Sequence, residues 1–246
     1  MQAEKTAVIL QSNYIPWKGY FDLVNAADVF ILFDEVQFTR RDWRNRNRII
    51  VGGEPRWLTI PVQTKGKYNV AIRDIEVVGA NWAIKHWSTV RSAYAKAPFF
   101  ARYAPGLEDA YDRAASETNL SPINRVFLAY LAACLDINTR FADCAEVPRT
   151  SADPTTRLIE LCQHFGATRY LSGPAAKNYI DPEAFCGADI ELRYADYTGY
   201  PEYNQNTQCF EHGVSIIDVL MQVGPDARTH LKSMQRDGLL EYHGQT

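Results

Sequence analysis

The stretch from Ala7 to Gln37 constrains the fold more strongly than any other part of the chain. Two continuous apolar runs, Ala7–Gln11 and Val29–Phe33, flank a turn with a proline and a glycine and then a short helical stretch. Continuous apolar runs are typical of parallel strands that are covered on both faces, and a helix between two such strands completes a βαβ unit. The stretch therefore predicts two neighbouring parallel strands of an α/β protein.

Polar side chains follow both of these strands. Gln11, Asn13 and Tyr14 come after the first strand, and Asp34 comes after the second. Ligands of open α/β sheets bind beyond the carboxyl ends of the strands, so we expect the site to begin at these residues. Asp34 is also the candidate ligand for a divalent ion that substrate phosphates would carry.

The rest of the chain continues the alternation of strands and helices. Ser121 and Asp153 are the expected N-caps of two of the helices. We expect one α/β domain over residues 1–246, with a mostly parallel, Rossmann-like sheet flanked by helices and a helical insertion or lid at residues 80–136. The further expected strands are 56–61, 69–78, 137–141, 169–171 and 190–194, and the helices are 82–96, 99–113, 122–135, 154–165 and one that begins at 215.

Composition and charge exclude several classes of protein. The chain has 246 residues, a net charge of −3 and 46% hydrophobic residues, which gives no reason to expect a nucleic acid partner. No apolar run reaches the roughly 18 residues of a membrane span, and the first residues lack the apolar core of a signal peptide. We expect a cytoplasmic protein without membrane insertion. The five cysteines show no zinc-ligand spacing, so no metal site is expected.

A strongly basic segment lies between Gln37 and Glu54. Guanidinium groups bind phosphate or carboxylate with two parallel hydrogen bonds, so the segment indicates a small phosphate-bearing ligand. Two alternatives are a solvated loop whose arginines pair with nearby carboxylates, and a nucleic acid site, which the overall charge disfavours. The arginines of this segment are Arg40, Arg41, Arg44, Arg46 and Arg48.

The turn YIPWKGY is similar to a nucleotidylyltransferase signature, in which a Pro/Gly turn carries H-x-G-H before a helix. Here Trp17 and Tyr20 stand where histidines would contact a triphosphate, with Gly19 between them. Neither side chain offers the same set of hydrogen-bond donors. The comparison favours the topology, and nucleotidyl transfer is kept as an alternative activity.

Two further segments carry candidate site residues. His86 is a candidate general base, although a histidine on an aromatic helix face is commonly a packed core residue. Ser172 and Gly173 form a small-residue turn after a strand, with Lys177 nearby, which predicts an anion site or an ordinary loop that needs its glycine. Gln205 and Glu211 are the polar candidates near the last helix.

Several motifs in a fixed order resemble the WbqC-like protein family, and the resemblance covers nearly the whole chain. They are Q-x-x-Y-x-P-W-x-G-Y (11–20), A-D-x-F-x-x-x-D-x-V-Q-F (27–38), W-R-N-R-N-R-I (43–49), W-L-T-I-P-V (57–62), K-H-W (85–87), Y-L-S-G (170–173) with Lys177 and Tyr179, and F-E-x-x-x-S-I-I-D-x-L (210–220). This family is associated with bacterial surface-polysaccharide gene clusters, including those of O-antigen and lipopolysaccharide.

The resemblance implies a pathway, and within it we expect a transferase that acts on a nucleotide-linked sugar. The most plausible reaction is N-acyl or aminoacyl transfer to an amino sugar, with an acyl-CoA or acyl carrier protein thioester as donor. Arg44, Arg46 and Lys65 would hold phosphates, and His86 would take the proton. Gln11, Tyr14, Asn45 and Asp34 would contact the sugar or the amine, and Tyr14 and Asp34 are candidate catalytic residues together with His86. A non-catalytic partner protein that binds nucleotide sugars is the further alternative.

Overall fold

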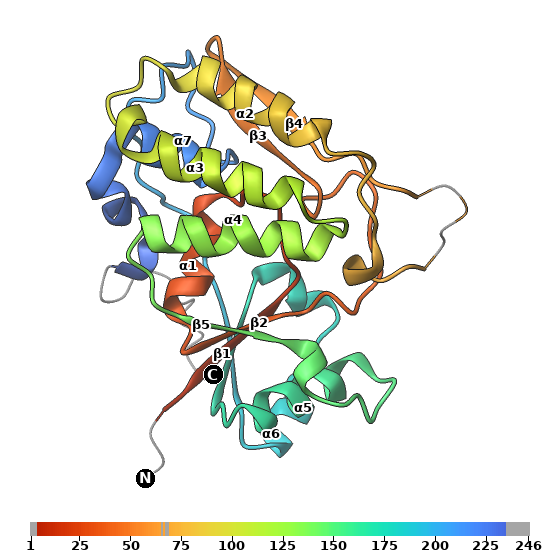
Figure 1. Cartoon of the computed structure of the whole chain (residues 1–246). Coiled ribbons are helices and arrows are strands. Elements are labelled where there is room, and N and C mark those ends of the chain that lie inside the picture. The colour runs from red at the N-terminus through yellow and green to blue at the C-terminus, as the bar shows by residue number, and fades with distance from the viewer. Residues whose placement is uncertain (1–3, 65, 67–68, 235–246) are drawn as a thin grey trace.

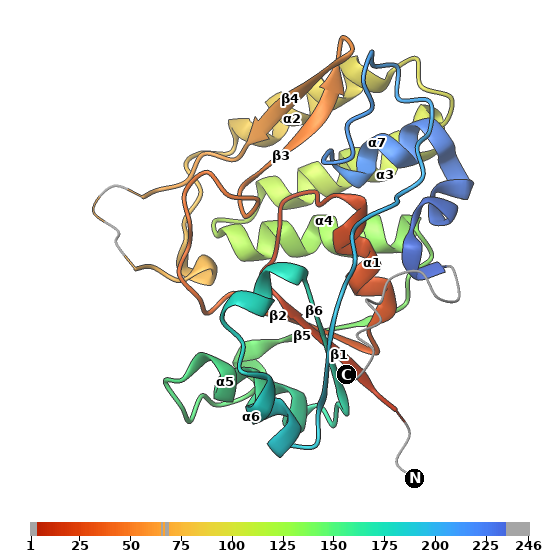
Figure 2. The same ribbon diagram turned by 180° about the vertical axis from the view of Figure 1, so that it is seen from behind.

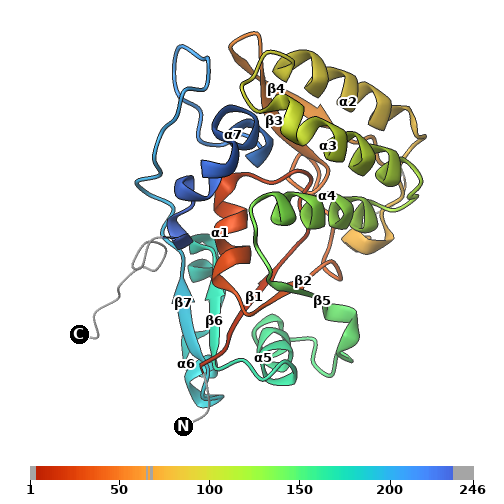
Figure 3. The same ribbon diagram turned by 60° about the vertical axis from the view of Figure 1, so that its left-hand side comes forward.

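A parallel sheet forms the centre of the molecule. The computed structural model describes residues 4–64, 66 and 69–234. Within these residues five strands form one sheet in the order β5-β2-β1-β6-β7, and every neighbouring pair is parallel (Figure 3). This confirms the expected α/β class. The strands are β1 (Thr6–Leu10), β2 (Val29–Leu32), β5 (Arg140–Asp143), β6 (Arg169–Ser172) and β7 (Glu191–Tyr194).

Helices cover both faces of this sheet. In Figure 1 the helices α1 to α4 lie on one side of the sheet, and α5 and α6 lie on the other. A separate antiparallel hairpin, β3 (Arg46–Val51) with β4 (Glu54–Thr59), lies beside α2 (Figure 2). The helices are α1 (Lys18–Ala26), α2 (Asn81–Tyr94), α3 (Phe100–Ala115), α4 (Leu120–Cys134), α5 (Pro154–His164), α6 (Pro182–Gly187) and α7 (Ile216–Val223).

The apolar runs of β1 and β2 are continuous because each strand contributes to two cores. Successive side chains of a strand point to opposite faces. Val8 and Phe30 belong to the larger core, which includes side chains of α1 to α4 and α7. Ile9 and Ile31 belong to a smaller core with α5 and α6. All four side chains are at most 4% exposed, as expected for strands in the middle of a parallel sheet.

The structure corrects two expectations about local elements. Residues 69–78 do not form a strand; they contain a short 3-10 helix, Ile72–Asp74, and isolated bridges such as Val62 with Val77. Ser121 does not cap its helix. The α4 helix begins at Leu120, two residues before the expected start, with Asn119 at the N-cap position, so Ser121 lies buried in the first turn. The Asp153 cap of α5 is confirmed, since its carboxylate accepts the Thr156 N–H at 2.7 Å.

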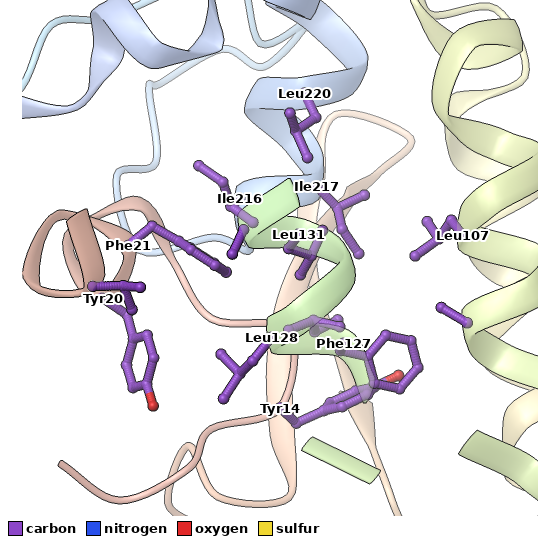
Figure 4. Close-up of a cluster of buried hydrophobic side chains, with 14 of the residues drawn as sticks. Tyr14, Tyr20, Phe21, Leu107, Phe127, Leu128, Leu131, Ile216, Ile217 and Leu220 are labelled. Atoms are coloured by element: carbon purple, nitrogen blue, oxygen red, sulfur yellow. The ribbon is translucent and has the colours of Figure 1, made fainter. Parts of the chain in front are cut away.

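Helices α2, α3 and α4 pack in one layer over the N-terminal part of the chain. Figure 4 shows Tyr14 beside Phe127 and Leu128 of α4, with Ile217 of α7 close to Leu131. The Tyr14 and Phe127 rings meet edge to face with centroids 5.3 Å apart. The one-domain organisation with a lid at residues 80–136 stays a prediction, but these helices share the larger core with β1 and α7.

Candidate functional site

The polar residues that follow β1 meet one arginine of the basic segment. The Arg44 guanidinium donates to Gln11 Oε1 at 3.1 Å and also to Asn13 Oδ1. Its side chain is 15% exposed and lies 3.7 Å from the Asp42 carboxylate. A guanidinium has five N–H donors, so these contacts hold Arg44 in place and leave donors for a ligand anion.

Asp34 fixes the end of β1 in place. One carboxylate oxygen accepts the Ser12 N–H at 2.8 Å, and the other accepts the hydroxyl of Ser121 in α4. The Asp34 residue is 2% exposed. Nearby, Asn124 of α4 donates to Ser12 Oγ at 3.0 Å and to the Arg44 carbonyl at 2.9 Å. These bonds tie α4 to the strand ends: Asp34 holds Ser12, next to Gln11, and Asn124 holds the Arg44 backbone. Asp34 does not line the cleft described next.

A cleft of about 400 Å³ opens beside Arg44 at this edge of the sheet. The cleft lies at the carboxyl ends of β1 and β6, which are neighbours in the sheet. The strand that follows β1 along the chain, β2, lies on the opposite side of β1, so the strand order reverses between β1 and β6. Such a reversal of strand order is where open α/β sheets bind ligands. The cleft lies between the strand ends, Arg44 and the start of α5. It is lined by Ile9, Leu10, Gln11, Phe33, Val36, Arg44, Pro154, Leu158, Tyr170, Ser172, Gly173, Ala175, Ala176 and Tyr179.

The other arginines of the basic segment do not line this cleft, and the side chains of Arg40, Arg46 and Arg48 have partners elsewhere. The Arg46 guanidinium lies 4.1 Å from the Trp57 ring centroid on the hairpin and donates to the Arg41 carbonyl. Arg48 forms an ion pair with Glu211 at 3.1 Å. Arg40 donates to the Thr64 carbonyl. Of the expected phosphate-binding residues, the structure brings Arg44 to the strand ends and places Arg46 on the hairpin. Lys65 lies outside the described residues.

His86 and Tyr14 form a buried pair under the hairpin. The Tyr14 hydroxyl lies 2.9 Å from His86 Nδ1 and 2.9 Å from the Tyr111 hydroxyl. Burial lowers the pKa of His86 to about 4, although a hydrogen bond with the Thr59 backbone opposes this shift. For Tyr14, whose charged form is the phenolate, burial instead raises the pKa. His86 is therefore neutral at pH 7, and its contacts with Tyr14 and the Thr59 backbone tie α2 to the hairpin and to Tyr14. Its role as a base stays a prediction.

The segment at residues 14–20 packs against the carboxyl end of β1. The Tyr20 hydroxyl donates to the Gln11 carbonyl at 3.1 Å. The Trp17 ring packs edge to face on Tyr197 and Tyr200, with centroids 5.1 and 5.6 Å away. A Cβ at Gly19 would lie 2.3 Å from the Trp17 ring, so this close approach requires glycine. Trp17, Gly19 and Tyr20 lie outside the cleft lining, and Tyr20 contacts the backbone carbonyl of Gln11.

Of the remaining candidates, only Ser172 and Gly173 line the cleft. The φ of Gly173, −71°, is one that any residue adopts, so its backbone does not need glycine. Lys177 is exposed, with its ammonium 5.3 Å from the Tyr194 ring centroid. Asn45 is buried and donates to the Ile60 carbonyl at 2.7 Å, which fixes the start of the hairpin. Gln205 accepts the Glu211 N–H at 2.8 Å, away from the cleft.

The comparison with known proteins agrees with the sequence motifs. The WbqC-like protein family matches residues 11–230. The chain belongs to this family. It is 42% identical over 228 residues to the uncharacterized protein Rv1507c of Mycobacterium tuberculosis (strain ATCC 25618 / H37Rv), and the alignment covers 93% of this chain and 98% of the relative. No solved structure matches the chain.

This WbqC-like protein also contains a buried polar cluster that joins Gln205, a candidate from the sequence, to residues that the sequence did not connect with it. Asp218 is fully buried and accepts hydrogen bonds from the Tyr94 hydroxyl at 2.7 Å, the Tyr203 hydroxyl at 2.6 Å and Gln205 Nε2 at 3.0 Å. Burial raises the pKa of Asp218. We call these residues, together with Lys18, the Asp218 cluster. It joins α1, α2 and α7 to the segment at residues 200–211.

Lys18 is the cation of the Asp218 cluster. Its residue is 2% exposed, and its ammonium donates to the Pro201 carbonyl at 3.3 Å. The rings of Tyr200, Tyr203 and Phe210 surround it with centroids 4.9 to 5.8 Å away. Burial lowers the pKa of Lys18 to about 8, against the opposing effect of nearby carboxylates such as Asp22. Sequence reasoning missed Lys18 because its partners lie about 180 residues away along the chain.

The described residues of this WbqC-like protein contain no group of three or more His, Cys, Asp or Glu side chains that is placed to hold a metal ion. Both Asp34 oxygens already accept hydrogen bonds. No helix among these residues is both long enough and apolar enough to cross a membrane.

Proposed function

We propose that this protein binds a nucleotide-linked sugar in the cleft and acts as a transferase of bacterial surface-polysaccharide biosynthesis. The observation that carries the proposal is Arg44, which Gln11 and Asn13 hold at the mouth of a cleft where the strand order reverses. A cleft of about 400 Å³ lies within the range that small-molecule sites occupy.

The cleft suits a ligand that carries both a negative charge and an uncharged ring. Arg44 supplies a fixed guanidinium for a phosphate, which it can bind with two parallel hydrogen bonds. Gln11 and Ser172 supply neutral hydrogen-bonding groups on neighbouring strands, as sugar hydroxyls or an amine require. Apolar side chains such as Phe33 and Leu158 complete the cleft. Nucleotide-linked sugars combine these features.

Within this proposal the reaction is amide formation on an amino sugar. The amine nitrogen attacks the carbonyl carbon of an acyl thioester, the C–N bond forms and the C–S bond breaks. Among the described residues, the cleft lining holds neither carboxylate nor imidazole. The proton from the amine therefore goes to the departing thiolate, which leaves as a thiol. Catalysis would come chiefly from holding the two reactants in the correct orientation.

The same lining gives a second candidate function. A cleft without an acidic or basic catalytic group would equally serve a non-catalytic protein that holds a nucleotide sugar for a partner enzyme. Nucleotidyl transfer, the other alternative, would release pyrophosphate. The three activities therefore differ in product: an acylated sugar, pyrophosphate, or none.

Thermal unfolding in the presence of UDP- and dTDP-linked amino sugars tests binding. A ligand present at 100 times its dissociation constant stabilises the folded state by about 2.7 kcal/mol. Incubation of the same mixtures with acyl-CoA, followed by mass spectrometry of the sugar, then tests transfer. A thermal shift without a mass change supports the non-catalytic alternative, and no shift with any nucleotide sugar contradicts the proposal.

A further inference from the structure

Tyr179 differs from the other large aromatic side chains of the cleft region in its exposure. It is 68% exposed, whereas Tyr170 of the same cleft is 2% exposed. Exposed aromatic rings are unremarkable when they are scattered over a surface. Tyr179, however, lines the cleft together with Arg44. Burial raises the pKa of its hydroxyl, and the Arg44 charge opposes that shift, which agrees with a position near the guanidinium.

Few lining side chains of the cleft besides Arg44 and the tyrosines carry polar groups. They are Gln11, whose Oε1 accepts from Arg44, and Ser172, whose Oγ accepts from the Tyr170 hydroxyl at 3.2 Å. The proposed function uses both of them for the sugar or the amine. The lining also contains the apolar side chains of Pro154, Leu158 and Ala176. A base beside Tyr179 would therefore meet a flat ring and apolar surface.

We propose that Tyr179 stacks on the nucleobase of the bound nucleotide while Arg44 holds its phosphates, so that the protein selects a flat base without reading its identity. This inference rests on the proposed function and names the part of the ligand that each end of the cleft contacts. Stacking on an aromatic side chain tolerates every base, because each base has a π-face. Uridine and adenosine nucleotides should therefore bind with similar affinity.

Isothermal titration with UDP, ADP and inorganic pyrophosphate tests the inference on three variants. Tyr179→Ala should weaken UDP and ADP binding about 5- to 150-fold, the range for loss of one stacked base. It should leave pyrophosphate binding unchanged, because pyrophosphate has no base. Tyr179→Phe keeps the ring and should bind all three ligands like the wild type. Ile84→Ala is the matched control, because Ile84 is also 68% exposed but lies on α2 outside the cleft lining.

The outcomes separate this inference from the proposed function. If Tyr179→Ala binds UDP like the wild type while Arg44→Gln weakens it, the stacking role is wrong and the cleft remains the nucleotide site. If Tyr179→Ala weakens pyrophosphate as much as UDP, or Tyr179→Phe is as weak as Tyr179→Ala, the ring does not act by stacking. If the wild type binds neither nucleotide, both proposals fail. Unchanged thermal midpoints of the variants would show that each one folds.

Discussion

The cleft and the Asp218 cluster are both assembled from polar side chains that lie far apart in the sequence, but their hydrogen-bonding groups are used differently. In the Asp218 cluster a fully buried carboxylate receives three donors, and Lys18 is enclosed by three rings. In the cleft, Arg44 is held by neutral amides beside about 400 Å³ of open space. Both regions contain a cation close to carboxylates.

This difference separates polar groups that stabilise the fold from polar groups that await a ligand. A buried charge is tolerated when hydrogen bonds satisfy it, and removing one partner leaves the others buried without a partner. Replacing a partly exposed guanidinium that has spare donors, such as that of Arg44, should lower the free energy of unfolding only slightly. Mutations should therefore affect folding in the Asp218 cluster and binding in the cleft.

The largest effect is expected for Asp218→Ala. It leaves the hydroxyls of Tyr94 and Tyr203 without their acceptor, removes one of the acceptors of Gln205 Nε2, and removes a negative charge near Lys18. The free energy of unfolding should fall by about 3–5 kcal/mol, measured by urea unfolding. Asp112→Ala, on the exposed face of α3, should change it by less than about 0.5 kcal/mol. A loss below about 1 kcal/mol at Asp218 would remove the distinction between the two regions.

His86 should make the protein sensitive to acid. Its pKa is about 4 in the folded protein and 6.5 in an unfolded chain, so between these values the unfolded state binds a proton that the folded state does not. Stability should therefore fall as the pH falls from 6.5 to 4, by as much as about 3 kcal/mol from this group. Urea unfolding of His86→Gln across this range should lack that component.

The matched control for His86→Gln is His164→Gln, since His164 is exposed on α5. This variant should retain the wild-type pH dependence. The same His86 variant tests the predicted catalytic role. If it folds and still binds nucleotide sugar but loses acyl transfer, His86 acts in the reaction; unchanged transfer would contradict its predicted role as a base.

Arg44→Gln should affect binding more than folding. A hydrogen bond to a charged group contributes about 1.5–3 kcal/mol, so nucleotide affinity should fall roughly 10- to 150-fold. The free energy of unfolding should change by about 1 kcal/mol or less, because the side chain is at the mouth of the cleft. Titration calorimetry and urea unfolding measure the two effects. Arg91→Gln, exposed on α2, is the control and should change neither. Equal affinities of Arg44→Gln and the wild type would place the phosphates elsewhere.

The smallest effect is expected for Arg46→Gln. This guanidinium lies against the Trp57 ring on the hairpin, so its removal should lower stability by about 0.5–1 kcal/mol. Nucleotide affinity should stay within about twofold of the wild type, since 0.4 kcal/mol corresponds to that factor. A loss of affinity as large as that of Arg44→Gln would show that both arginines reach the ligand, as the basic segment alone suggests.

The sheet and most helices could be predicted from the sequence because their signals are local. The apolar runs of β1 and β2 and the Asp153 cap of α5 each depend on neighbouring residues. The failures are places where distant contacts override a local pattern. Residues 69–78 alternate like a strand, yet their backbone forms a short 3-10 helix and isolated bridges, for example with Gln37 and Asn119. Ser121 resembles a cap, but its hydroxyl bonds to Asp34.

The candidate site was predictable only in part, for the same reason. The rule that ligands bind at strand ends pointed to Gln11 and Ser172, and both residues line the cleft. The direction of each arginine was not predictable, because it depends on the hairpin: in β3, Arg46 and Arg48 are two residues apart and lie on the same face as Trp57 of β4. Lys18 reads as an ordinary surface lysine in the sequence, and only its aromatic neighbours reveal it.

The central position of β1 has a consequence for the order in which the protein becomes competent during synthesis. One wall of the cleft, with Gln11 and Arg44, leaves the ribosome early, together with β1 and β2. The opposite wall comes from α5, β6 and residue 179, and β6 pairs with β1 only after residues 169–172 have emerged. A nascent chain therefore has no complete cleft to hold a metabolite until residue 179 has emerged. A ligand can therefore stabilise the late pairing of β6 with β1, but it cannot assist the early pairing of β1 with β2.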